Sequence, residues 1–71
     1  MPEFVALSKK LKKYRKELDQ NQMEFAAHCG VSTEILSLIE REKTDPKLST
    51  LQKFAAYLGV TVSDLLEVDY N

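Results

Sequence analysis

Apolar residues recur at steps of three and four along the first quarter of the chain, and polar or charged residues fill most positions between them. The apolar series consists of Phe4, Leu7, Leu11, Tyr14 and Leu18. This spacing is typical of a helix that buries one stripe of side chains and exposes lysines on its opposite face. We therefore expect a first helix from Phe4 to Leu18.

The next stretch carries the signals of two short helices joined by a tight turn. Asn21 followed three residues later by Glu24 is typical of a helix start, because the Asn oxygen can accept from an unsatisfied amide and the glutamate favours the positive end of the helix. Gly30 can adopt the left-handed conformation that closes a helix. Ser32 then caps a third helix, which we expect to end near Arg41. Two helices joined this closely must cross steeply.

A polar segment that contains a proline, residues 42–47, is predicted to be a loop. Ser49 with Gln52 has the spacing of a capping box, which predicts that a fourth helix starts there. Gly59 is a suitable residue to end that helix.

Thr61 with Asp64 marks the start of a last, short helix. No stretch of the chain alternates polar and apolar residues long enough to indicate a sheet. The chain has 71 residues and a hydrophobic fraction of 44%, enough for one small core. We therefore predict an all-α fold in which residues 1–71 form one compact five-helix domain.

The charge of the chain is unevenly distributed. Six of the ten Lys and Arg residues lie within residues 1–16, together with one acidic residue, although the formal net charge is −1. The overall charge therefore does not itself indicate a nucleic-acid binder, but it conceals a basic face.

Composition excludes several classes of site. Cys29 is the single cysteine, so neither an intramolecular disulfide nor a cysteine-based metal cluster can form, and His28 has no second ligand nearby. The sequence contains no nucleophile–base pair or phosphate-binding loop, so we expect neither an enzyme nor a cofactor nor a small-molecule substrate. The amino-terminal segment is amphipathic and rich in lysine, which argues against a signal peptide or a membrane span. We expect a soluble, cytoplasmic protein that does not bind membranes.

Residues 22–41 carry the pattern of a helix-turn-helix. Such a unit needs a small residue where its helices touch, a glycine at the turn and apolar residues at fixed offsets on the second helix. Ala26, Gly30, Leu36 and Ile39 meet these needs in register.

At this point the sequence resembles the lambda repressor/Cro-like family of helix-turn-helix regulators, also called the XRE family. The resemblance covers nearly the whole chain, through the stretches NQMEFA, GVS, LIER, TLQKFAAYLGV and VSDLL and through Pro46 and Leu48 in the intervening loop. It implies a lambda repressor-like five-helix fold and a transcriptional regulator, specifically a repressor, that binds double-stranded operator DNA.

The resemblance also implies roles for individual residues. Gln22 matches a glutamine that contacts a DNA phosphate, and a helix N-terminus is physically suited to an anion. Residues expected to enter the major groove are Thr33, Glu34, Ser37 and Leu38, and Ser32 is also expected to bind DNA. Residues expected beside the DNA backbone are Arg41, Lys43 and Lys47. Arg15 and Glu40 match an internal ion pair with a structural role.

The base-reading positions depart from the family pattern, which favours Arg, Gln or Ser. Here they hold Glu34, Ile35 and Leu38. Glu34 could accept a hydrogen bond from a cytosine amino group while Thr33 and Leu38 meet thymine methyl groups, which are allowed major-groove contacts. Alternatively, this acidic and apolar surface could bind protein, as in an antirepressor or a partner-binding subunit. Both hypotheses stay open at this level.

Two turns also depart from the pattern. Glu42 stands where the family commonly has glycine after the third helix, and Asp19 with Gln20 replaces a common Gly-Leu. A non-glycine residue at positive φ costs on the order of 1 kcal/mol, so we expect altered turns and an intact fold.

The end of the chain is rich in apolar residues, more than one small core should cover. These residues are Val60, Val62, Leu65, Leu66, Val68 and Tyr70. We therefore predict a homodimer formed through the last helix and tail, residues 61–71. A two-fold dimer would hold its recognition helices about one DNA turn apart, roughly 34 Å.

Overall fold

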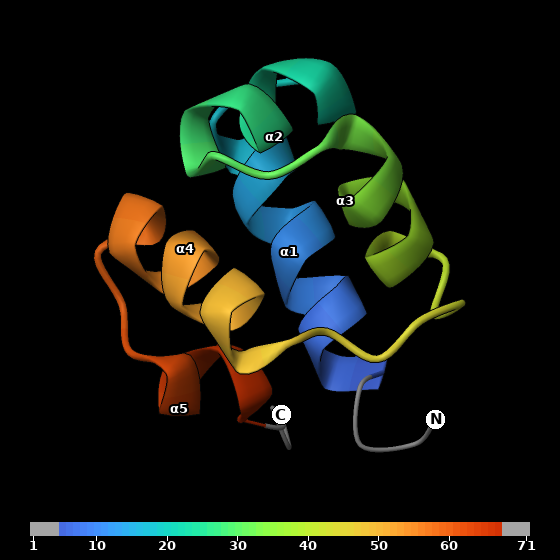
Figure 1. The fold of residues 1–71 in the computed structure, drawn as a ribbon. Helices are drawn as coiled ribbons and strands as arrows, with labels where there is room; N and C mark the ends of the chain where they lie inside the picture. Colours follow the sequence, from blue (N-terminus) through green and yellow to red (C-terminus); the bar gives the residue numbers. More distant parts are fainter. Residues whose placement is uncertain (1–4, 68–71) are drawn as a thin grey trace.

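The computed structural model describes residues 5–67, which form five α-helices (Figure 1). The helices are α1 (Val5–Glu17), α2 (Gln22–Cys29), α3 (Thr33–Glu40), α4 (Leu48–Leu58) and α5 (Val62–Leu66). These residues contain no β-strand. The predicted all-α fold with five helices is confirmed.

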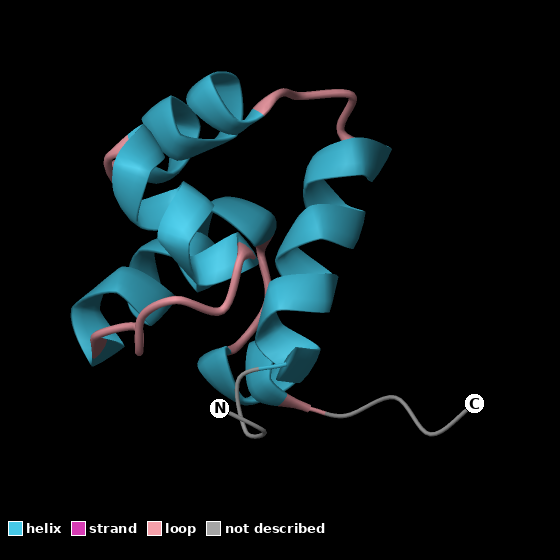
Figure 2. Cartoon of the chain, turned by 90° about the vertical axis from the view of Figure 1, so that its right-hand side faces the viewer, coloured by secondary structure: helices cyan, strands magenta, loops and turns pink. Residues whose placement is uncertain are grey.

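Helix α1 forms the centre of the arrangement, with α2 and α3 toward one end and α4 and α5 beside it (Figure 1). α3 and α5 both pack against α1, while α4 packs against α2 and α5. In Figure 2, α1 stands upright and a loop at its upper end leads across to α2. Among the residues described, no helix is long and apolar enough to cross a membrane.

Two of the three predicted capping boxes are present. At the start of α2, the Glu24 amide donates to Asn21 Oδ1 over 2.8 Å and the Asn21 amide donates to Glu24 Oε1 over 2.9 Å. At the start of α5, Thr61 and Asp64 exchange the equivalent bonds over 2.9 and 3.0 Å. Hydrogen bonding of the Asp64 carboxyl group to Thr61, first to its backbone and then to its side chain, lowers the pKa of that carboxyl group.

The capping box predicted from Ser49 and Gln52 is wrong. Helix α4 begins at Leu48, and its N-cap is Lys47, which makes no side-chain capping bond. Ser49 is consequently the second residue inside the helix, where its side chain cannot cap the first turn.

The core gathers apolar side chains from all five helices. The buried set comprises Leu7, Leu11, Phe25, Ala26, Cys29, Leu36, Ile39, Leu51, Phe54, Ala55 and Leu65. The rings of Phe25 and Phe54 stack at a centroid distance of 6.1 Å, and Tyr57 meets Phe25 edge-on at 5.8 Å. Aromatic packing therefore joins α2 to α4.

The apolar stripe predicted for the first helix is only partly correct. Leu7 and Leu11 are fully buried, but Leu18 follows the end of α1 and remains 46% exposed. Phe4 lies outside the described residues. A polar residue, Ser8, occupies a buried position on α1, where its hydroxyl donates to Glu42 Oε2 over 3.5 Å.

Left-handed residues end α1 and α3 without the help of glycine. Asp19 has a φ of 56° and Glu42 a φ of 59°. After α3, the Glu42 amide donates to the Ile39 carbonyl and the Lys43 amide to the Leu38 carbonyl, over 3.0 and 2.8 Å. This paired arrangement satisfies carbonyls at the helix end and is usually built around glycine. The fold thus accommodates Asp19 and Glu42 in place of the family's common residues, and both turns carry backbone strain.

Candidate nucleic-acid interface

Helices α2 and α3 pack together around a short turn. Gly30 has a φ of 81° and donates its amide to the Ala26 and Ala27 carbonyls, which ends α2. Ser32 Oγ then accepts from the Ile35 amide over 3.1 Å, which starts α3 only two residues later. Local hydrogen bonds therefore set the angle between the two helices.

One face of α3 is buried and the other is open. Leu36 and Ile39 belong to the core, and Ala26 of α2 is fully buried in the same cluster. We call Ser32, Thr33, Glu34, Ser37 and Leu38 the leading edge of α3. Its first three residues are exposed, whereas Ser37 and Leu38 are half-buried. The residues predicted to enter the major groove thus lie on the accessible side of α3, and Ile35 beside them is 38% exposed.

A polar network that includes Arg15 of α1 joins the start of α2 and the turn before it to the end of α3. Arg15 Nε donates to Glu40 Oε2 over 2.9 Å and Arg15 Nη2 donates to Glu40 Oε1 over 3.0 Å. Gln22 Nε2 donates to the same Glu40 Oε1 over 3.0 Å. Arg15 Nη1 also donates to the Gln20 carbonyl over 3.2 Å. The ion pair predicted between Arg15 and Glu40 is present in this geometry, and it includes Gln22, which sequence reasoning did not connect to it.

Sequence spacing gave no signal for the bond between Gln22 and Glu40. The two residues are 18 positions apart and lie on different helices. Only the packing of α2 against α3 brings their side chains together.

Three basic side chains follow the leading edge along the chain. Arg41, Lys43 and Lys47 are all exposed. Arg41 caps the end of α3 and its Nε donates to the Ser37 carbonyl over 3.4 Å, while Lys47 is the N-cap of α4. The basic residues predicted to lie beside the DNA backbone are therefore on the α3–α4 loop and its two ends.

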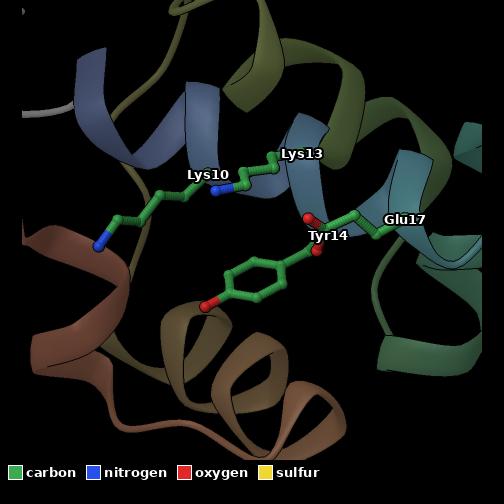
Figure 3. Close-up of a pocket in the computed structure, with 4 residues that line it drawn as sticks. All are labelled: Lys10, Lys13, Tyr14 and Glu17. Carbon is green, nitrogen blue, oxygen red and sulfur yellow. The ribbon is translucent and has the colours of Figure 1, made fainter. Parts of the chain in front are cut away.

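Part of the lysine-rich face of α1 lies away from the leading edge of α3 and the basic residues that follow it. Figure 3 shows a shallow pocket lined by Lys10, Lys13, Tyr14 and Glu17, with the Tyr14 ring pointing from α1 toward α4. Lys10 Nζ donates to the Asp64 carbonyl over 2.6 Å, which ties α1 to α5. Since Arg15 extends from α1 toward α3, these lysines stand on a different side of α1 from the network around Glu40.

A second polar cluster, which sequence reasoning also missed, connects the α1–α2 turn to α4. Gln20 Nε2 donates to Tyr57 Oη over 2.9 Å, and His28 Nδ1 lies 3.3 Å from the same oxygen. His28 is exposed. Within residues 5–67, no group of three or more His, Cys, Asp or Glu side chains is arranged to hold a metal ion.

The prediction for the dimer surface needs correction at Leu65. This residue is 0% exposed, because α5 packs against α1 and α4 and buries it in the core. Val60, Val62 and Leu66 are partly buried and pack against the same core. The expectation that a single core could not cover these residues is thus wrong for Leu65 and overstated for the other three. The remaining two residues of the predicted surface, Val68 and Tyr70, lie outside the described part of the chain.

Comparison with known proteins places this architecture in a family. A family model described as "Helix-turn-helix" matches residues 11–65. The chain is 39% identical over 63 residues to the HTH-type transcriptional regulator DdrOP3 of Deinococcus deserti, covering 89% of this chain and 49% of that protein. It is 39% identical over 62 residues to the HTH-type transcriptional regulator SinR of Bacillus subtilis, covering 86% and 56%. The chain thus spans about half the length of these curated relatives.

A solved structure agrees with this assignment. The crystal structure of the hypothetical transcription factor NHTF from Neisseria superposes with a TM-score of 0.83 at 31% sequence identity, and the match covers 92% of this chain and 75% of that one. The helical arrangement, the match over residues 11–65 and these similarities together show that the chain belongs to the helix-turn-helix transcriptional regulators of the lambda repressor/Cro-like type, the XRE family.

Proposed function

We propose that this chain binds a specific double-stranded DNA operator as a homodimer and represses transcription there. The observation that carries the proposal is the division of α3 into a buried face, with Leu36 and Ile39, and an accessible leading edge. The major groove of B-DNA, about 12 Å wide, admits one α-helix. A short helix braced from behind by the core can therefore present side chains to base edges.

The chemistry of the leading edge suggests which bases it reads. The Glu34 carboxylate only accepts hydrogen bonds, so its natural major-groove partner is the amino group of cytosine. The Thr33 methyl group and the exposed part of Leu38 fit thymine methyl groups. The proposed operator half-site accordingly presents a cytosine and at least one thymine to α3 in the major groove.

Contacts to the phosphates would hold this helix in register. Gln22 begins α2, where free backbone amides and the helix dipole favour an anion. Arg41, Lys43 and Lys47 supply exposed positive charge on the other side of the leading edge. Such contacts fix orientation and provide affinity without reading sequence.

Dimerisation would supply the second half-site. The proposed interface is the outer surface of α5 and the segment after it, with Val60, Val62 and Leu66 contributing their exposed parts and Val68 and Tyr70 completing it. Two-fold symmetry would place the two copies of α3 about 34 Å apart, one turn of DNA. A dimer seated on a promoter would repress by excluding other proteins, which requires neither a cofactor nor a catalytic residue.

Selection of duplexes from a random DNA pool, followed by titration of the enriched sequence at two salt concentrations, tests the proposal. We expect one enriched sequence with two half-sites about 10 base pairs apart and an affinity that falls steeply with salt. Failure to enrich any sequence, with no duplex bound even at low salt, would refute the function.

Ile35 supports a second candidate, because a large apolar side chain that is 38% exposed beside Glu34 also suits a protein partner. In that case the leading edge would bind an antagonist or a partner subunit. The same titration separates the two functions. If the leading edge binds only protein, no duplex should bind, and the affinity for the protein partner should depend only weakly on salt.

A further inference from the structure

Glu40 is a buried carboxylate that accepts three hydrogen bonds from two residues on other helices. Its side chain is 2% exposed, and it accepts from Arg15 at both oxygens and from Gln22 at Oε1. A carboxylate paired with a guanidinium group can only accept hydrogen bonds. The amide of Gln22 must therefore turn its nitrogen, and not its oxygen, toward Glu40.

This constraint determines what Gln22 presents to its surroundings. The side-chain amide carries two N–H groups, and one of them is used on Glu40. The other makes no hydrogen bond among residues 5–67, and the Gln22 side chain is only half-buried. Glu40 thus leaves one N–H donor of Gln22 free, in a defined orientation, at the first residue of α2.

The support behind Gln22 is itself rigid. Arg15 holds Glu40 through two parallel bonds and also binds the Gln20 carbonyl, two residues before α2 begins. A bidentate guanidinium–carboxylate pair has a fixed planar geometry. The Arg15–Glu40 pair therefore holds both the backbone before α2, through Gln20, and the side chain of Gln22.

We propose that Glu40 is a positioning residue for DNA binding, which holds the Gln22 amide so that its second N–H donates to a DNA phosphate. The inference rests on the proposed function and assigns Glu40 a role beyond the stability of the ion pair. A long side chain loses rotamer freedom when it binds a ligand, which costs free energy. Because Glu40 already restricts the Gln22 side chain, this cost on binding a phosphate is smaller.

A double-mutant cycle on the selected operator tests this coupling. Gln22→Met removes the amide at similar size, and Glu40→Gln removes the charge at similar size. We expect each single variant to weaken binding about tenfold and the double variant to bind no more weakly than Gln22→Met alone. If Glu40→Gln weakens binding by the same factor whether residue 22 is Gln or Met, its role is structural and the proposal is refuted.

Interference by ethylation of single phosphates gives a second readout that loss of stability would not change. We expect wild-type binding to be sensitive at one phosphate near the start of α2, and both single variants to lose that sensitivity. Ile39→Val is the matched control, because it weakens the core next to Glu40 without touching the amide. An interference pattern that Glu40→Gln leaves unchanged would contradict the proposal.

A measurement on the unmodified protein covers the case in which Glu40→Gln does not fold. Side-chain amide hydrogen exchange by NMR should be at least tenfold slower for the Glu40-bonded proton of Gln22 than for Gln52, which is exposed on α4. Equal exchange at both glutamines overturns the inference. If a duplex is bound but Gln22→Met binds it as tightly as wild type, the positioning role fails while the proposed function stands; if no duplex is bound at all, the proposed function itself fails.

Discussion

Arg15 and Glu40 form an ion pair between α1 and α3, in which the carboxylate is buried and the arginine side chain is mostly buried. The side chain of Glu40 is 2% exposed and that of Arg15 is 16% exposed, and two bonds of 2.9 and 3.0 Å join them. Each charge compensates the cost of burying the other. The free energy of unfolding should therefore fall most when only one partner is removed, because the other charge then stays buried alone.

Replacing one partner of this pair should destabilise the fold strongly. We expect Arg15→Met to lower the free energy of unfolding by about 3–5 kcal/mol, because Glu40 then stays buried without its counter-charge. The double variant Arg15→Met/Glu40→Leu should lose clearly less. Urea denaturation measures both. Lys9→Met, which also replaces a positive charge by methionine but at an exposed position of α1, is the control, and a loss for Arg15→Met no larger than for this control would count against a buried pair.

The left-handed residue after α3 offers a stabilising substitution. Glu42 has a φ of 59°, where glycine is free of strain, so Glu42→Gly should raise the free energy of unfolding by up to about 1 kcal/mol, less what the 3.5 Å bond from the Ser8 hydroxyl contributes. Thermal unfolding would show this as a higher Tm. Lys43→Gly is the control, because Lys43 has no positive φ and gains nothing from glycine. A Tm of Glu42→Gly no higher than that of Lys43→Gly would contradict the prediction.

The thiol of Cys29 should be unreactive in the folded protein. Burial raises the pKa of Cys29 from 9.0 to about 11, so the nucleophilic thiolate is scarce at neutral pH. Iodoacetamide should label the native chain far more slowly than the chain in denaturant. Comparable labelling rates in the two states would contradict the burial.

The same shift makes stability depend on alkaline pH. Because the folded state retains the proton and the unfolded state releases it, the stabilising contribution is complete below pH 9 and is lost as pH rises through about 11. The free energy of unfolding should therefore fall between these values more steeply in wild type than in Cys29→Ala. Parallel curves for the two proteins would exclude this linkage.

Two lysines distinguish the proposed DNA surface from the rest of the basic surface. Lys43→Ala should weaken binding to every duplex and reduce the slope of log affinity against log salt by about 1, since one phosphate contact is lost. Lys13, an exposed residue that lines the pocket on α1, is the matched control (Figure 3). A slope that changes equally in Lys13→Ala would place the DNA on another face.

Adjacent leucines of α5 should behave differently. Leu65→Ala is expected to cost about 2–5 kcal/mol in the free energy of unfolding, because the residue is fully buried. Leu66→Gln, at a partly exposed site, should instead shift the chain from dimer to monomer in sedimentation experiments. Leu48→Gln, which replaces a leucine of α4 that is 63% exposed, serves as control. A Leu66→Gln protein that remains as dimeric as this control would exclude α5 from the interface.

Local signals predicted the helices well because their chemistry spans only three or four residues. Asn21 with Glu24 and Thr61 with Asp64 form the predicted capping boxes, and Gly30 and Gly59 close helices in left-handed conformations. The failure at Ser49 has the same local origin: the Ser–Gln spacing does not say which residue is the N-cap, and the chain entering from the proline loop starts α4 at Leu48.

Burial near the end of the chain could not be predicted in this way. The apolar run around α5 fits either an interface or a core, because composition records how much apolar surface exists and not where it lies. Packing of α5 against α1 and α4 assigns Leu65 to the core.

By itself, the sequence determined the five helices, most of their ends and the family, since periodicity and capping depend on neighbours along the chain. It also indicated Arg15 with Glu40 through family resemblance. The tertiary structure alone decided that Gln22 joins this pair, because a hydrogen bond of 3.0 Å between residues 18 positions apart depends on how two helices cross. Long-range geometry of this kind arises only when the core closes around Phe25, Leu36 and Phe54 and brings distant side chains within reach of one another.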